Sequence, residues 1–258
     1  MTKNLFSVCA LGAMVLTSCS NEVDMFETIG TPKGTLNVNC SYDNEMSTRA
    51  TQNADESWII KAGEIALSQG SNSIPAGTYT VTASNYANEA AALAAKTGWG
   101  DAFYTGSKDG VVVTKGENEN INIDCGKAKN ARMKVNFNLI QIFTDVKLVA
   151  DLTTEEPAHT GRNLEFNVDN ASSALAYFAA SAKVSCKLSY TFNGTSKERT
   201  FDFTLAGAAT ENTITVNTNE NGTITITLSN ISYDDEFGSG SSSVITIDAG
   251  SGEVLPVA

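Results

Sequence analysis

The chain has 258 residues, of which 41% are hydrophobic and 18% are charged, and its formal net charge is −12. This length and composition fit one large or two ordinary globular domains and exclude an intrinsically disordered chain. The acidic balance argues against nucleic-acid binding, which relies on clustered lysine and arginine, and against electrostatic docking on anionic lipid.

The N-terminus is typical of a bacterial lipoprotein signal. The apolar run from Leu5 to Leu16 is too short to span a bilayer but suits the hydrophobic region of a signal peptide. It ends in Leu16-Thr17-Ser18-Cys19, which resembles the lipobox. Proteins with this motif are cut before the cysteine, which is then acylated. We therefore predict a signal peptide over residues 1–18, lipidation of Cys19 and an acylated tether over residues 19–33. The acyl chains would bind outer-membrane lipid and leave the protein exposed on the cell surface.

Alternation of apolar and polar side chains with a period of two follows the tether. In residues 35–42, Leu36, Val38, Cys40 and Tyr42 share one face, which predicts a half-buried strand. Similar segments recur to the end of the chain, and turn signals such as Asn193-Gly194 fit hairpins between them. Further strands are expected within 58–67, 79–83, 111–113, 121–125, 133–139, 142–150, 164–168, 184–192, 199–205, 212–217, 223–229 and 243–248.

Two segments depart from this alternation. Residues 87–97 are rich in alanine and predict one helix, with Gly98 placed to end it. Residues 170–181 fit either a helix or extended chain.

The spacing of the strands predicts an all-β fold. Short strands that recur about every 8–12 residues are typical of β-sandwiches. The alternation pauses at residues 127–131, so we predict two tandem β-sandwich domains over 34–128 and 129–258, with one short helix in the first. One large sandwich over the whole chain is the alternative.

Three cysteines remain once the signal peptide and Cys19 are set aside. Cys40, Cys125 and Cys186 each stand at an apolar position of a predicted strand, so we expect buried free thiols. A disulfide between Cys40 and Cys125 is the alternative in an oxidising compartment.

The residues that enzymes need are scarce. The single histidine, His159, lies in a polar segment, so neither a Ser-His-Asp nor a Cys-His arrangement is indicated. No metal-ligand spacing and no phosphate-binding glycine loop is found, and the acidic Asp234-Asp235-Glu236 fits a solvated loop. We predict a protein that is no enzyme and holds no metal or cofactor, although a pair of carboxylates that meet only in space escapes detection in a sequence.

Aromatic residues follow the predicted helix in the segment 98–104. A loop that carries aromatic rings suits contact with a ligand, so Trp99 and Tyr104 are candidates for stacking on sugar rings. The alternative is that Trp99 covers the end of a sandwich core.

Five features of the sequence belong together. They are the lipobox ending at Cys19, the strand Gly34–Tyr42, Ser47-Thr48-Arg49-Ala50, Ile74–Val81 and the junction Cys125–Val135. With them the chain resembles the fimbrillin-like surface lipoproteins of Bacteroidales, or a related uncharacterised family of two-domain β-sandwich lipoproteins. The resemblance implies two transthyretin-like sandwiches and a fimbrial subunit or adhesin-like component of the cell surface.

The same resemblance implies a route of assembly. In polymerising fimbrillins an arginine-specific protease cuts after the first strand, and a strand of a neighbouring subunit fills the groove. Arg49-Ala50 lies at the matching place, so other β-sandwich subunits are expected partners by strand addition; an ordinary exposed arginine is the alternative. The predicted function is thus a non-enzymatic surface lipoprotein of fimbrial or adhesin type that contacts other subunits or a host surface. The alternative is a glycan-binding surface lipoprotein of a polysaccharide uptake system.

Overall fold

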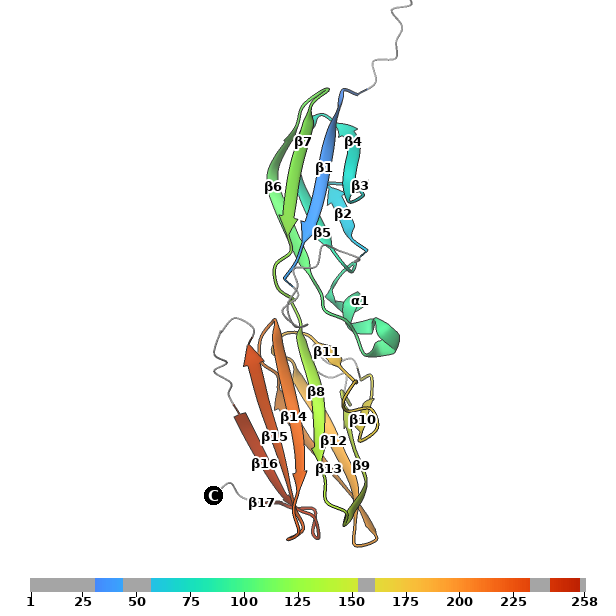
Figure 1. The fold of residues 1–258 in the computed structure, drawn as a ribbon, viewed down its shortest axis with the longest axis vertical. Coiled ribbons are helices and arrows are strands. Elements are labelled where there is room, and N and C mark those ends of the chain that lie inside the picture. The colour runs from blue at the N-terminus through green and yellow to red at the C-terminus, as the bar shows by residue number, and fades with distance from the viewer. Residues whose placement is uncertain (1–30, 44–56, 153–160, 233–241, 256–258) are drawn as a thin grey trace, which may run out of the picture.

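Two stacks of β-sheets lie end to end in the protein, which is described from a computed structural model (Figure 1). Cys19, Arg49-Ala50, His159 and Asp234–Glu236 lie outside the residues that the structure describes, as does the segment 1–18. The described residues are 31–43, 57–152, 161–232 and 242–255.

The first stack is a sandwich of a three-stranded and a four-stranded sheet. In the smaller sheet β1 is the middle strand, antiparallel to β4 and parallel to β7. The smaller sheet is ordered β4 (Gly70–Pro75), β1 (Lys33–Ser41) and β7 (Asn118–Asp124). The larger is ordered β3 (Ile65–Leu67), β2 (Ile59–Ala62), β5 (Gly77–Ser84) and β6 (Thr105–Val113).

The second stack repeats this plan with longer strands. Its first strand, β8, runs parallel to the later strand β14, as β1 does to β7. One sheet is ordered β11 (Ala176–Phe178), β8 (Ala131–Asn138), β14 (Thr210–Thr218), β15 (Thr223–Ser232), β16 (Ser242–Asp248) and β17 (Val254–Leu255). The other is ordered β10 (Leu164–Asn167), β9 (Phe143–Ala150), β12 (Lys183–Phe192) and β13 (Thr195–Thr204).

Each stack has its own core, and the prediction of an all-β sandwich fold is confirmed. The alternation in β1 buries Leu36, Val38 and Cys40, which are at most 2% exposed. The first core is built from residues between Leu36 and Ala128, together with Tyr177, and the second from residues between Met133 and Ala249.

Three local structures differ from the sequence-based expectation or complete it. The helix α1 (Glu89–Ala94) is shorter than predicted, because Lys96 and Thr97 adopt φ angles of 50° and 60° and continue as the 3₁₀ turn η1 (Lys96–Gly98). β4 was not predicted, because its sequence has no alternation and it forms by pairing with β1. The ambiguous segment 170–181 contains a short strand, β11, which pairs with β8.

The three cysteines in the described residues are buried and free, as expected. Burial raises the pKa of Cys40 to about 11 and that of Cys125 to about 12. Burial also raises the pKa of Cys186. All three thiols are therefore protonated at neutral pH. Burial and protonation both suppress their reaction, because the thiolate is the nucleophile.

We predict that the chain without residues 1–19, which lacks Cys9 and Cys19, resists alkylation by iodoacetamide at pH 8. Mass spectrometry should show no adduct on the folded protein and three adducts after unfolding in urea without reductant. A single adduct after unfolding would instead show that Cys40 and Cys125 are bridged.

Candidate functional site at the domain junction

The two sandwiches meet through the segment that follows β5. The Asn88 side chain caps α1 by accepting a hydrogen bond from the Ala91 N–H at 2.9 Å. Beyond η1, the Tyr177 N–H on β11 donates to the Trp99 carbonyl at 2.9 Å. Gly100 lies under this contact with a φ of +82°, and a Cβ there would come within 3.1 Å of Leu93 O and of Tyr177 Cβ. The close approach of the two sandwiches therefore requires glycine at this position.

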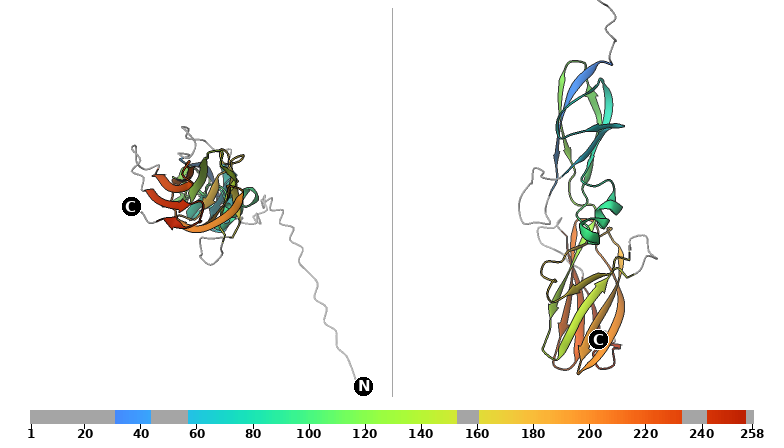
Figure 2. Two further views of the ribbon diagram at one scale, coloured as in Figure 1. Left: turned by 90° about the horizontal axis from the view of Figure 1, so that it is seen from below. Right: turned by 90° about the vertical axis from the view of Figure 1, so that its right-hand side faces the viewer.

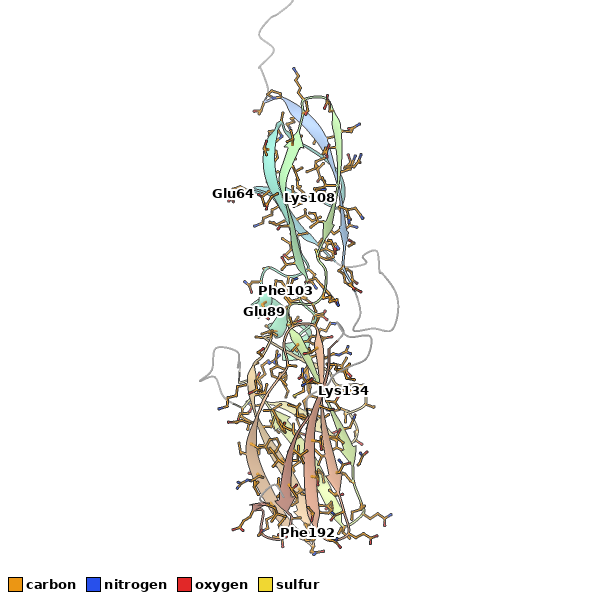
Figure 3. All side chains as sticks on the ribbon, turned by 90° about the vertical axis from the view of Figure 1, so that its left-hand side faces the viewer. Glu64, Glu89, Phe103, Lys108, Lys134 and Phe192 are labelled. Carbon is orange, nitrogen blue, oxygen red and sulfur yellow. The ribbon has the colours of Figure 1, made fainter. Side chains whose placement is uncertain are left out.

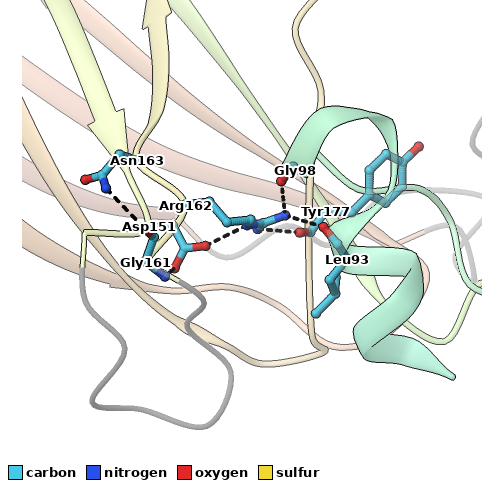
Figure 4. A network of polar contacts seen from close by, with 7 residues as sticks. All are labelled: Leu93, Gly98, Asp151, Gly161, Arg162, Asn163 and Tyr177. Carbon is cyan, nitrogen blue, oxygen red and sulfur yellow. Dashed lines mark hydrogen bonds and ion pairs between the residues drawn. The ribbon is translucent and has the colours of Figure 1, made fainter.

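Arg162 is the centre of the junction (Figure 4). Its Nε donates to Asp151 Oδ2 at 2.8 Å within the second sandwich. Its two terminal nitrogens contact the first sandwich and also strand β11 of the second. They donate to the carbonyl oxygens of Leu93 at 2.9 Å, Gly98 at 2.8 Å and Tyr177 at 2.7 Å. One guanidinium thus joins the helical segment of the first sandwich to the second.

The Arg162–Asp151 pair is removed from water. The side chain of Arg162 is 9% exposed and that of Asp151 is 0% exposed. The guanidinium carbon also lies 4.7 Å from the centre of the Phe178 ring. Removing two charges from water costs free energy, so such a pair persists only when its remaining hydrogen-bonding groups also find partners. Here three backbone carbonyls accept hydrogen bonds from the remaining N–H groups of the guanidinium.

Asn130 makes a second connection where the chain passes between the sandwiches. Its side chain is fully buried, accepts a hydrogen bond from the Phe103 N–H at 3.1 Å and donates to the Asp101 carbonyl at 2.8 Å. Its own carbonyl accepts from the Ala209 N–H at 3.1 Å. The connecting chain is therefore fixed to both sandwiches rather than being a free linker.

A buried carboxylate lies at the junction end of the second sandwich. Glu211 on β14 accepts hydrogen bonds from Arg132 and Lys134 on the neighbouring strand β8. Burial acts to raise the pKa of Glu211, but the hydrogen bonds and charges of Lys134 and Arg132 outweigh it and hold the pKa below its ordinary value. These partners account for the charge, so the group is structural rather than poised for acid–base chemistry.

A hollow of about 430 Å³ opens beside the junction. Trp99 lines it and also packs on Phe166 in a T-shaped contact, with 5.0 Å between ring centres. Burial raises the pKa of Tyr177, so its hydroxyl is neutral at ordinary pH. We call this the junction hollow, and it is lined by Lys96, Trp99, Gly100, Asn170, Ser173, Ala174, Leu175 and Tyr177.

The two aromatic residues singled out from the sequence have different surroundings. Trp99 is half-buried, covers the end of the second core and still lines the junction hollow. Tyr104 is 3% exposed and its ring centre lies 4.5 Å from that of Tyr42 in the first core, so its faces are not presented to a ligand. Arg162, Asp151 and Tyr177 were not singled out, because nothing in the local pattern shows that they meet.

In the described residues, no group of three or more histidine, cysteine, aspartate or glutamate side chains is arranged to hold a metal ion. None of the helices in that part of the chain has the length and apolar character needed to cross a membrane.

Comparison with known proteins gives a family and several distant structural resemblances, three of which are described below. A family model described as a domain of unknown function, DUF4493, matches residues 33–251. No curated protein sequence matches the chain. The comparisons therefore establish the family, and the function has to be inferred from the residues of this chain.

The three solved structures are distant in sequence. A candidate cell adhesion protein from Bacteroides ovatus is 11% identical, with a TM-score of 0.36 over 70% of this chain and 91% of that one. A fimbrial assembly protein from Parabacteroides distasonis is 12% identical, with a TM-score of 0.38 over 69% of this chain and 77% of that one. A candidate cell adhesion protein from Bacteroides fragilis is 12% identical, with a TM-score of 0.28 over 70% of this chain and 67% of that one.

The junction geometry predicts a large effect of Arg162→Ala. The substitution leaves the buried Asp151 carboxylate without its guanidinium and three carbonyls without their donor, so the free energy of unfolding should fall by about 3–5 kcal/mol. Urea unfolding of the Trp58→Phe background, in which Trp99 is the one remaining tryptophan, would report the loss by fluorescence.

Lys147→Ala in the same background is the matched control. It breaks an exposed ion pair with Glu165, so unfolding should change by less than about 1 kcal/mol. An Arg162→Ala effect no larger than that of Lys147→Ala would show that the junction does not depend on the guanidinium.

Proposed function

We propose that this chain, which belongs to the DUF4493 family, is a non-enzymatic cell-surface lipoprotein that acts as a fimbrial-type subunit or adhesin-like component. The observation that carries the proposal is the position of β1, in the middle of a sheet and next to the predicted processing site. Cys19 would supply the lipid anchor in the outer membrane.

β1 is bonded on both sides. Six of its residues are in register with β4 and seven with β7. Its removal would expose the backbones of both neighbours and uncover the core that Leu36, Val38 and Cys40 fill. Full burial of an apolar side chain contributes about 1.5–3 kcal/mol, so the vacated groove would strongly favour an extended segment that restores both the hydrogen bonds and the apolar contacts.

The order of features along the chain links this groove to release from the membrane. β1 lies between the predicted anchor, Cys19, and the predicted cleavage site, Arg49-Ala50. A cut after Arg49 would separate both the anchor and β1 from the rest of the subunit. The proposed partner is a strand of a neighbouring β-sandwich subunit, which would replace β1.

This proposal predicts that a trace of arginine-specific protease converts the chain without residues 1–19 into a polymer. Mass spectrometry should show a fragment of residues 20–49, and light scattering after gel filtration should show oligomers. An excess of a synthetic peptide covering residues 33–43 should suppress the oligomers, because it refills the groove.

Arg49→Lys is the control, because it preserves the positive charge but not the protease site. It should stay intact at this bond and monomeric under the same treatment. A cut wild-type chain that releases residues 20–49 and still remains monomeric would contradict assembly by strand replacement.

Glycan binding is the second candidate function, and the junction hollow is the observation that favours it. Trp99 offers an aromatic surface there, and Lys96, Asn170 and Ser173 offer hydrogen-bonding groups. A concave site with an aromatic wall and a few polar groups suits a sugar ring. In this role the protein would serve a polysaccharide uptake system.

We predict that Trp99→Phe lowers the affinity for any glycan found on an array by about five- to tenfold, since the smaller ring keeps the core packing but loses stacking area. Isothermal titration would measure the change. Trp58→Phe, the same substitution in the first core, should leave the affinity unaltered. Equal affinities of wild type and Trp99→Phe would exclude the junction hollow as the site.

A further inference from the structure

The sheets β4-β1-β7 and β8-β14-β15-β16 face the same side of the molecule. The sheets β3-β2-β5-β6 and β10-β9-β12-β13 form the opposite side, as Figure 1 and the right-hand view of Figure 2 show. Because Arg162 and Asn130 fix the junction, the outward side chains of the first two sheets form one long surface.

On the first sandwich this surface is covered by small uncharged polar side chains. Along β1, every second residue is buried, and the residues between them point outward. These outward residues pair in register with outward residues of β7. Ser71 and Ser73 continue the pattern on β4. The outward residues of the paired strands are Thr35, Asn37 and Asn39 on β1 and Asn118, Asn120 and Asn122 on β7.

The second sandwich continues the surface with the same kinds of side chain. Its buried residues Val135, Ile214 and Ile226 alternate with outward polar ones. Two adjacent rows cross the sheet. One contains Asn136, Thr215 and Thr227 and ends at the exposed Val244 on β16, and the other contains Asn138, Asn217, Thr225 and Thr246. We call the outward residues of both sandwiches on this side the neutral face. Of its charged residues, Asp124 stands at a strand end, and the ion-paired cluster of Arg132, Lys134 and Glu211 lies on β8 and at the start of β14, next to the junction.

The opposite side of the molecule is charged. Lys61 and Lys108 are exposed on the first sandwich, and Glu64 projects from the same side (Figure 3). On the second sandwich, ion pairs cross between outward residues of neighbouring strands. They are Lys147–Glu165 at 3.0 Å, Lys183–Asp202 at 3.1 Å and Lys187–Glu198 at 3.3 Å. A chain with a net charge of −12 therefore keeps most of its sheet charge away from one side.

The asparagines of the neutral face form bridges that leave hydrogen-bonding groups able to bind a ligand. Asn37 donates to Asn120, and Asn39 to Asn122, at 2.9 Å each, and Asn138 donates to Asn217 at 2.8 Å. In each bridge the first amide keeps its oxygen and the second keeps at least one N–H, since Asn122 donates once to the Ser41 hydroxyl at 3.2 Å. Both donors and acceptors are thus held in fixed rows.

The neutral face is also hollowed on the first sandwich. β4 ends opposite Val38, which leaves the edge of β1 uncovered beyond that point. The result is a hollow of about 580 Å³ whose walls include Asn37, Asn39, Gln69 and Asn120.

From the separation of charge and the fixed rows of amides and hydroxyls, we propose that the neutral face binds an uncharged polysaccharide chain laid along the molecule. Sugar hydroxyls are donors and acceptors at once, as the amides and threonine hydroxyls of the face are. An uncharged chain is repelled by no charge there, and the main charged group that it crosses, the cluster of Arg132, Lys134 and Glu211, is already ion-paired. This inference depends neither on strand replacement nor on the junction hollow.

The same observations favour a long chain over other occupants. A nucleic acid needs clustered positive charge, which the rows of the face do not supply. A protein partner needs a cluster of apolar or aromatic anchors, whereas the exposed apolar residues of the face, Ile231 and Val244, stand singly among polar side chains. A neutral hydrogen bond to water-exposed groups contributes little net affinity by itself. Many such contacts are needed, so affinity should rise with the number of sugar units.

The test is native affinity electrophoresis of the chain without residues 1–19, in gels containing a soluble β-glucan, a galactomannan or the acidic polymer polygalacturonate. The variant Asn39→Glu/Asn136→Glu places one carboxylate on each half of the neutral face. The control Thr82→Glu/Thr200→Glu adds the same charge at exposed outward positions of the opposite side. Equal added charge keeps the mobilities of the two variants comparable.

We expect retardation by at least one of the two neutral polymers, stronger for longer chains, and none by polygalacturonate. The face variant should bind about tenfold more weakly and the control within about twofold of wild type. The inference is overturned if neither neutral polymer retards the wild type, or if both variants lose binding equally. It is also overturned if gel filtration shows a wild-type dimer that only the face variant dissociates, since the occupant would then be a second copy.

Discussion

The arrangement of the whole molecule depends on one buried guanidinium. Arg162 neutralises Asp151, which is fully buried, and at the same time donates to carbonyls of Leu93 and Gly98 in the other sandwich. A buried charge tolerates little displacement, because any loss of its partners leaves it desolvated without compensation. The junction is therefore held in one geometry, whereas contacts between domains of one chain are often loose enough to allow relative motion.

Two other features depend on this geometry. The junction hollow exists because Trp99 leaves its own sandwich and packs on Phe166 of the next. The neutral face is continuous only because the sheets of both sandwiches that carry it are turned to the same side. A flexible linker would have preserved both sandwiches and removed both features.

The two sandwiches share a plan that bears on assembly. In each, the first strand lies parallel to a much later strand of the same unit: β7, the last strand of the first sandwich, and β14, which precedes the last three strands of the second. Asn37 and Asn138 bridge to asparagines on these parallel partners in the same way. Because β1 is the N-terminal strand of its domain, one cleavage on its C-terminal side separates it from the rest of the chain. The plan thus makes β1 both essential to the core and removable.

Local sequence patterns were enough to predict secondary structure wherever burial is decided by neighbouring residues. The alternation of Leu36, Val38 and Cys40 predicts β1, and the alanine-rich segment predicts α1, because period and propensity are properties of nearby residues. The single histidine also led to the prediction that the chain carries no histidine-dependent catalytic group, and the lipobox led to the prediction of a lipid anchor at Cys19.

The remaining features arise only in the folded chain. β4 forms without any pattern because β1 supplies its hydrogen bonds, Tyr104 is buried because Tyr42 covers it, and Arg162 meets Leu93 across 69 residues of sequence. Such contacts join residues far apart in the chain, and their energy comes from the desolvation and pairing of groups that no local period records.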